Sequence, residues 1–189
     1  DKLNISDTIC DPASVAALPA LSVDEPTVSM TFQVNDSPFA GREGKFVTSR
    51  NIKERLDKEL ISNVALKVVQ GDSPDKFIVS GRGELHLSVL IETMRREGFE
   101  LAIFKPQVVK KDVGGEIHEP YEQIVIDVEE IHQGAIMEEL GPRKAELQSM
   151  ESDGKGRVKL EFIAPSRGII GFRSHFLTIT SGTGIMTSV

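Results

Sequence analysis

Cysteine is almost absent from this chain, in which Cys10 is the only one. A lone cysteine excludes an internal disulfide and fits a reducing compartment, and no Cys/His cluster has the spacing of metal ligands. No apolar run approaches the length of about 18 residues that spans a bilayer, and the N-terminus lacks the basic-then-apolar pattern of a secretory signal. The sequence therefore predicts a cytoplasmic protein without a metal site or a membrane partner.

The chain also lacks the Gly-x-x-x-x-Gly-Lys-Ser/Thr loop that cradles phosphates. The nearest pattern, Gly41-Arg42-Glu43-Gly44-Lys45-Phe46, has the wrong spacing and no hydroxyl after the lysine. Glu84 and His86 are no acid/base pair, because side chains two apart on a helix diverge. We interpret His86 as a half-buried packing or interface residue, and we expect no catalytic residue and no bound cofactor.

A basic surface is missing as well, since the net charge is −7. Residues 1–26 carry one Lys/Arg against five Asp/Glu, residues 27–105 twelve against eleven, and residues 106–189 nine against thirteen. No segment is a general polyanion binder, so contact with RNA has to come from a few placed side chains and loop amides. DNA is not an expected partner. The acidic residues of segment 127–139 are interpreted as solvated faces, with a divalent-cation site as the alternative.

The pattern of residues 27–105 predicts a complete small domain. Residues 1–26 are too short to bury a core and are interpreted as the tail of a preceding domain plus a linker. The predicted elements are a strand over 28–34, a helix over 49–63 capped by Thr48 or Ser49, strands over 64–70 and 76–80, a helix over 83–96 and a strand over 99–104. This βαββαβ order is that of a ferredoxin-like sandwich.

The same order recurs over residues 106–189. The predicted elements are a strand over 121–130, a helix over 133–140, strands over 145–151 and 157–164, a weaker helix over 166–177 and a strand over 185–189. Gly168 and Gly171 weaken that helix by roughly 1 kcal/mol each, which indicates close approach of another backbone or a contact surface. The predicted fold class is α+β, with two ferredoxin-like βαββαβ sandwiches in tandem.

The stretch Ser80–Leu87 (Ser-Gly-Arg-Gly-Glu-Leu-His-Leu) is the most distinctive motif. It combines a strand end, a Gly-x-Gly turn and a helix start in which Glu84 complements the helix dipole. This run resembles the third domain of the ribosomal translocase family, which includes elongation factor G, LepA, the tetracycline-resistance factors and BipA/TypA. Five further segments resemble the BipA/TypA branch in particular: Asn35–Gly44, Ser49–Ile52, Phe104–Val108, Arg167–Arg173 and Ser181–Met186.

The resemblance implies a division of the chain into known domains. Residues 1–26 resemble the end of the family's β-barrel domain II, residues 27–105 its domain III, and residues 106–189 its domain V. The family implies a bacterial cytoplasmic GTPase that binds the 70S ribosome and acts in translation, large-subunit assembly and stress and cold adaptation. GTP and Mg would bind in an N-terminal GTPase domain, and a basic C-terminal domain would reach toward the transfer-RNA site. Neither domain is in this chain, so the resemblance implies no GTP binding here.

The resemblance also implies partners and contact residues. The partners are ribosomal RNA, ribosomal proteins and the parent's own GTPase and C-terminal domains, with domain III passing nucleotide state onward as a domain rotation. The expected ribosome or RNA contacts are basic side chains of both sandwiches: Arg42, Lys45, Arg50, Lys53, Lys155, Arg157, Arg167 and Arg173.

Other interpretations compete with this one. The chain could be part of elongation factor G or LepA, which Asn35–Gly44 and Arg167–Arg173 disfavour. It could also be a ligand-binding module or a small acylphosphatase-like enzyme, with Arg42 and Asn35 near an anion-binding loop. An RNA-recognition domain of the stacking type needs exposed aromatics on its central strands. With one tyrosine, no tryptophan and Phe32 facing inward, that interpretation is excluded.

Overall fold

The computed structural model describes residues 5–19 and 25–188. The predicted tail over 1–26 therefore lies partly outside the described residues, as does Val189. The described part of the chain divides between Gln107 and Val108 into two compact units, here called unit 1 and unit 2. The junction expected at Lys105-Pro106 falls between two short strands that both pair with the first strand of unit 1.

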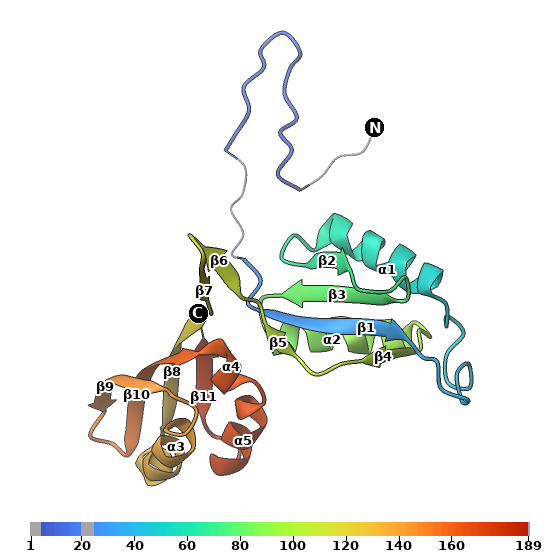
Figure 1. Ribbon diagram of the computed structural model, residues 1–189. Coiled ribbons are helices and arrows are strands. Elements are labelled where there is room, and N and C mark those ends of the chain that lie inside the picture. The colour runs from blue at the N-terminus through green and yellow to red at the C-terminus, as the bar shows by residue number, and fades with distance from the viewer. Residues whose placement is uncertain (1–4, 20–24, 189) are drawn as a thin grey trace. The chain divides into compact units, whose positions relative to one another are not determined.

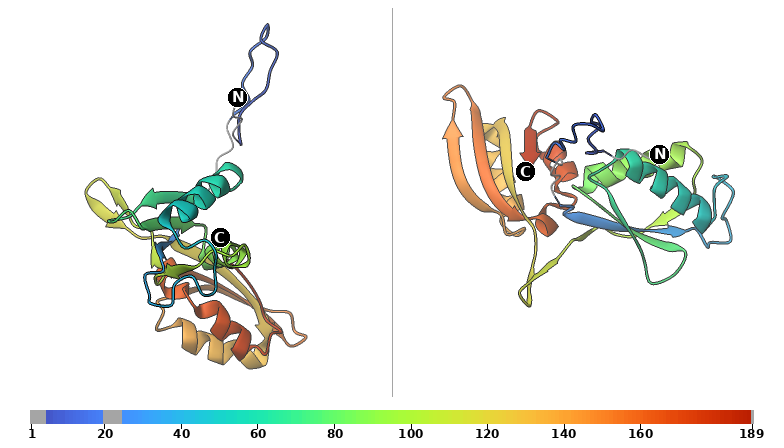
Figure 2. Two further views of the ribbon diagram at one scale, coloured as in Figure 1. Left: turned by 90° about the vertical axis from the view of Figure 1, so that its right-hand side faces the viewer. Right: turned by 90° about the horizontal axis from the view of Figure 1, so that it is seen from above.

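Unit 1 is a sheet with two helices on one side of it (Figures 1 and 2). Its sheet has the order β2-β3-β1-β4, and β5 also pairs with β1. The elements are β1 (Val28–Val34), α1 (Ser49–Ser62), β2 (Lys67–Gln70), β3 (Lys76–Gly81), α2 (Glu84–Arg96), β4 (Leu101–Ile103) and β5 (Gln107–Val108).

Alternation along β1 separates the two faces of this sheet. Val28, Met30 and Phe32 are buried, and they pack with α1 and α2 through Ile52, Leu56, Leu87, Leu90 and Met94. The Thr48 hydroxyl accepts a hydrogen bond from the Asn51 amide and so caps α1, as predicted. Two strands are shorter than predicted. The chain turns at Asn63–Leu66 before β2, and Phe99 and Glu100 pair with Phe46 of the loop between β1 and α1 before β4 begins.

Unit 2 repeats this arrangement with the sheet order β11-β8-β10-β9. In both units the first strand of the repeat lies between its fourth and its third, and the second strand is at the edge. The elements are β6 (Lys111–Val113), β7 (Glu116–His118), β8 (Tyr121–Glu129), η1 (Glu130–His132), α3 (Gln133–Leu140), β9 (Glu146–Ser152), β10 (Arg157–Pro165), α4 (Ser166–Ile169), α5 (Phe172–Ile179) and β11 (Ile185–Ser188). The fold is α+β with tandem ferredoxin-like units.

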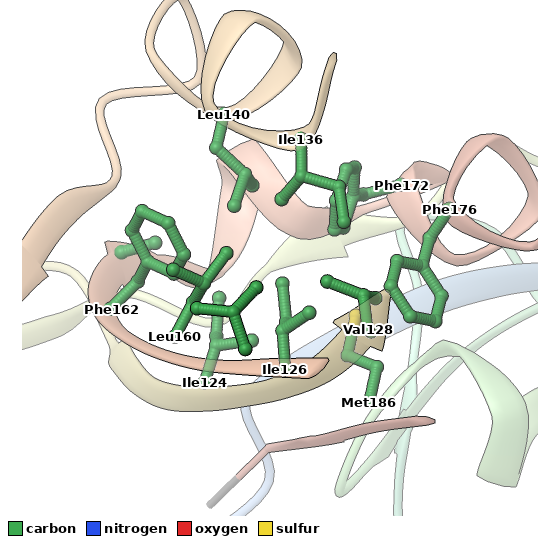
Figure 3. Close-up of a cluster of buried hydrophobic side chains, with 12 residues drawn as sticks. Ile124, Ile126, Val128, Ile136, Leu140, Leu160, Phe162, Phe172, Phe176 and Met186 are labelled. Atoms are coloured by element: carbon green, nitrogen blue, oxygen red, sulfur yellow. The ribbon is translucent and has the colours of Figure 1, made fainter. Parts of the chain in front are cut away.

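The core of unit 2 is formed where α3 and α5 face the sheet (Figure 3). Alternate residues of β8 and β10 meet two phenylalanines of α5, whose ring centroids lie 6.1 Å apart. The cluster comprises Ile124, Ile126, Val128, Ile136, Leu140, Val158, Leu160, Phe162, Ala164, Phe172, Phe176 and Met186.

In unit 2 one prediction was wrong and one hairpin was not predicted. The single helix expected over 166–177 is two helices, because the chain breaks at Ile170 and at Gly171, whose φ is +74°. The hairpin of β6 and β7 was missed, although Gly114 and Gly115 both have positive φ, 67° and 92°, as a two-residue hairpin turn of type I′ requires. Its two strands are exposed throughout, and at three residues each they are too short to show an alternation of apolar and polar residues.

Candidate functional site

The loop between β1 and α1 is held by a single carboxylate, that of Glu100, which is distant in sequence but precedes β4, the strand paired with β1. The Glu100 side chain enters the loop and accepts hydrogen bonds from four donors. They are Asn35 Nδ2 at 2.6 Å, Gly44 N at 3.0 Å, Gly41 N at 3.1 Å and Glu43 N at 3.2 Å. A side chain at position 44 would not fit, since a Cβ there would lie 2.7 Å from Glu100 Cβ.

These bonds favour the ionised form of Glu100. Desolvation raises the pKa of its carboxyl, but the bonds from Asn35 and the three loop amides outweigh that effect and hold the pKa below its ordinary value. The base of the loop is closed by the amides of Lys45 and Phe46, which donate to Gly98 O at 2.8 and 3.1 Å. The loop is therefore a fixed structure and not a solvated excursion of the chain.

The tip of this loop presents an aromatic ring and a guanidinium to solvent. Phe39 is 62% exposed, and Arg42 stacks with its guanidinium carbon 4.8 Å from the ring centroid. Lys45 follows and is exposed. Arg42 and Lys45 form no ion pair within 4 Å among the described residues, so both cations are available to an external anion.

The other two candidates of unit 1 lie on the first turns of α1. Arg50 Nε is 2.8 Å from Glu54 Oε1, and both side chains are mostly exposed. Such a pair contributes little to stability and exchanges readily for another anion. Lys53 is exposed on the same helix and has no ion pair within the described parts of the chain. The structure therefore brings the four candidates of unit 1 onto one loop and the helix that follows it.

In unit 2 two of the four candidates form ion pairs with carboxylates of the chain and two do not. Arg157 Nε lies 2.8 Å from Asp127 Oδ1, and Arg167 Nε lies 2.6 Å from Glu119 Oε2. The bond from Arg167 lowers the pKa of the Glu119 carboxyl. Lys155 occupies the turn between β9 and β10, and Arg173 the start of α5. Both are exposed and unpaired with carboxylates in the described residues, so of the four candidates these two are available to an external anion.

The segment Arg167–Arg173 is positioned by Arg143, a residue that no sequence motif indicated. Arg143 Nη1 donates to the carbonyls of Gly168 at 2.8 Å and Ile170 at 3.4 Å, and the guanidinium also pairs with Glu139 at 2.9 Å. A Cβ on Gly168 would lie 2.4 Å from Arg143 O, so the predicted close approach of another backbone is confirmed. The cost of this glycine is explained by packing inside unit 2.

The side chain of His86 is engaged within unit 1. His86 is half-buried, as predicted, with Nε2 3.0 Å from Asn63 Nδ2 and Nδ1 facing the Arg82 amide at 3.3 Å. No group of three or more His, Cys, Asp or Glu there could hold a metal ion. None of the described helices combines the length and apolarity needed to traverse a bilayer.

Comparison with known proteins adds to this geometry. Residues 116–189 match the family described as Elongation factor G C-terminus. The chain is 65% identical over 187 residues to a protein of Salmonella typhimurium named large ribosomal subunit assembly factor BipA, covering 99% of this chain and 31% of that protein. Proteins of the same name from Haemophilus influenzae and Buchnera aphidicola are 66% and 56% identical, and the chain covers 30% and 31% of them.

A solved structure resembles the fold. A crystal structure of a protein from Thermus thermophilus covers 90% of this chain and 41% of its own, with a TM-score of 0.52 and 14% identity. At that identity the likeness concerns the fold alone. The chain spans about a third of the length of the relatives named above, which it matches from end to end of its own sequence. The chain is thus a BipA/TypA-like fragment that carries an elongation factor G C-terminal domain.

Proposed function

We propose that this chain is the ribosome-binding and interdomain-signalling portion of a BipA/TypA-like translational GTPase. The observation that supports the proposal most is identity of 56–66% over almost the whole chain to proteins named large ribosomal subunit assembly factor. Residues 27–105 act as domain III, residues 106–189 as domain V, and residues 1–26 end the β-barrel domain II. GTP and Mg bind in the GTPase domain of the parent, which is cytoplasmic and acts in translation, ribosome assembly and stress adaptation.

Recognition in this proposal depends on a few fixed cations. Arg42, Lys45 and Lys53 in unit 1 and Lys155 and Arg173 in unit 2 are exposed and unpaired among the described residues, and they meet phosphates of ribosomal RNA. Arg50, Arg157 and Arg167 contribute by exchanging their carboxylates for phosphates. Because the chain as a whole is acidic, ordered placement and not bulk charge provides the affinity.

The acylphosphatase-like alternative is disfavoured by the first loop. An anion site there would need loop amides that are free to hold a phosphate. The amides of Gly41, Glu43 and Gly44 already donate to Glu100, and the Asn35 side chain donates to the same carboxylate. A second anion in that position would be repelled by the negative charge of Glu100, so the inside of the loop does not bind an anionic substrate. Arg42 instead points outward from the loop.

The proposal is tested by charge reversal at one cation of each unit. We expect the double variant Arg42→Glu/Arg173→Glu to pellet with purified 70S ribosomes at least about tenfold less well than the unaltered chain at low salt, because two phosphate contacts become repulsions. The matched control is Arg82→Glu, since Arg82 is exposed in the turn after β3, and the end of β3 pairs with the start of β1, away from the first loop. Equal pelleting of all three proteins would remove Arg42 and Arg173 from the contact surface.

A further inference from the structure

The sheet of unit 1 has a second face, opposite to the one that α1 and α2 cover (Figure 2). Side chains of this face alternate with the core residues along each strand. Strand register places them in three rows that cross the sheet. The first row is Lys67, Ser80 and Ser29, the second Val69, Ile78, Thr31 and Phe104, and the third Lys76, Gln33 and Ala102.

The second row is an apolar stripe that folding leaves in water. Val69 is 48% exposed, Ile78 38% and Phe104 49%. Phe104 continues β4 by one residue, since its amide donates to Thr31 O at 3.0 Å, and this pairing puts its side chain on the same face as that of Thr31. Three of the four strands thus contribute an exposed apolar side chain to this row, with the partly exposed Thr31 on β1 between Ile78 and Phe104, and such a grouping favours an interaction surface over scattered apolar residues.

The charge of this face is opposite to that of the chain. The five strands of unit 1 contain no aspartate or glutamate, and they supply Lys67 and Lys76 to the first and third rows. Lys105 follows Phe104 and is exposed. The Lys76 ammonium lies 6.0 Å from the centroid of the Phe104 ring and 3.2 Å from Asp72 in the β2–β3 turn. An apolar stripe bordered by lysines, in a chain of net charge −7, is complementary to an anionic partner with flat apolar faces.

We propose that this open sheet face binds single-stranded RNA, with one base stacked on Phe104 and the flanking phosphates on Lys67, Lys76 and Lys105. Bases stack on exposed aromatic rings of a sheet, and lysines follow the backbone. Binding of a protein to this face is the other outcome that the test below distinguishes. The proposal rests on the proposed function, which makes ribosomal RNA the source of the strand.

This surface differs from that of the stacking-type RNA-recognition domain excluded on sequence grounds. Such a domain stacks bases on aromatics of its two central strands, whereas Phe32 of β1 is fully buried here. The single ring of Phe104 lies at the β4 side, opposite Thr31. One stacked base and three phosphate contacts predict modest affinity, weak sequence preference and a strong dependence on salt.

The test uses the 189-residue chain and a fluorescein-labelled single-stranded RNA of about 12 nucleotides, followed by anisotropy at several salt concentrations. We expect Phe104→Leu, which keeps the apolar volume but removes the ring, to weaken binding by about fivefold or more. Lys67→Gln should reduce the slope of log affinity against log salt by about 0.7. The matched controls are Tyr121→Leu, an aromatic 57% exposed in unit 2, and Lys58→Gln on α1, and neither should change binding.

The outcomes separate this inference from the function on which it rests. Equal RNA binding by Phe104→Leu and by the unaltered chain would overturn the inference, whether or not the chain pellets with ribosomes. Weaker pelleting of Phe104→Leu with 70S ribosomes, with RNA binding unchanged, would also overturn it and would assign the face to a ribosomal protein. Failure of the unaltered chain to pellet with ribosomes, together with RNA binding that depends on Phe104, would refute the proposed function and leave the RNA surface standing.

Discussion

Two helical glycines of unit 2 give opposite predictions for the same substitution. Gly134 lies in α3, and a Cβ there would meet no atom within 4 Å. Gly134→Ala should therefore stabilise unit 2 by about 0.5–1 kcal/mol, the usual gain when alanine replaces glycine in a helix. Gly168 lies in α4, where a Cβ would be 2.4 Å from Arg143 O. The same change there should destabilise the unit.

The magnitude at Gly168 follows from the size of the overlap. Carbon and carbonyl oxygen normally approach to about 3.4 Å, so the segment has to move by about 1 Å. Overpacking of this kind costs about 1–3 kcal/mol. The movement also lengthens the hydrogen bond from Arg143 Nη1 to Gly168 O, which is now 2.8 Å. Gly168→Ala should thus lower the stability of unit 2 by about 1–3 kcal/mol and its Tm by about 5 °C or more.

The assay takes advantage of an unusual composition. The chain has no tryptophan, and its one tyrosine is Tyr121 in β8, so tyrosine fluorescence reports the unfolding of unit 2 alone. Urea and thermal melts of the two variants and the unaltered chain give the order Gly134→Ala, unaltered chain, Gly168→Ala. Gly168→Ala as stable as Gly134→Ala would refute the claim that Arg143 and Gly168 are in tight backbone contact.

Three further predictions concern the first loop, the core and the nucleotide. Glu100→Gln should speed amide hydrogen exchange at Gly41 and Gly44 while core amides stay protected, and unchanged exchange in the variant would contradict this. Because the pKa of Glu100 is lowered in the folded chain, the stability that its carboxylate contributes is complete above about pH 4.3 and is lost as the pH falls through the lowered pKa. Leu56→Ala, at a fully buried position of α1, should cost about 2–5 kcal/mol in a chemical melt followed by circular dichroism, and a loss under about 1 kcal/mol would count against the assigned core. The chain should give no heat of binding with a GTP analogue in calorimetry, whereas measurable binding would contradict the proposal that nucleotide binds only in the GTPase domain of the parent.

Much of the fold could be predicted because it is encoded locally. The alternation of β1, the 3.6-residue period of α1 and α2 and the cap at Thr48 depend on neighbours within a few positions. The repeated βαββαβ order then indicated two ferredoxin-like units, and the motif Ser80–Leu87 indicated the family. The strands β6 and β7 are only three residues long and show no alternation, so Gly114-Gly115 is the one local signal of their hairpin, and the hairpin was missed.

The candidate surfaces could be predicted only in part, since the conformation of each depends on hydrogen-bond partners that are far away in the sequence. The loop before α1 is held by Glu100, which lies 56 to 65 positions from its four donors. Arg143 reaches Gly168 across 25 positions. The side of the sheet on which Phe104 lies follows from strand register and not from composition. Sequence patterns selected the basic side chains, but not which of them are paired within the chain.

The most direct test of the proposed function is co-sedimentation of this chain with purified 70S ribosomes across a salt series, beside a full-length relative loaded with a GTP analogue. Binding through a few placed phosphate contacts predicts that the chain pellets at low salt and is released steeply as salt rises. If the relative pellets and the chain stays in the supernatant even at the lowest salt, recognition lies outside residues 27–188 and the proposed function is contradicted.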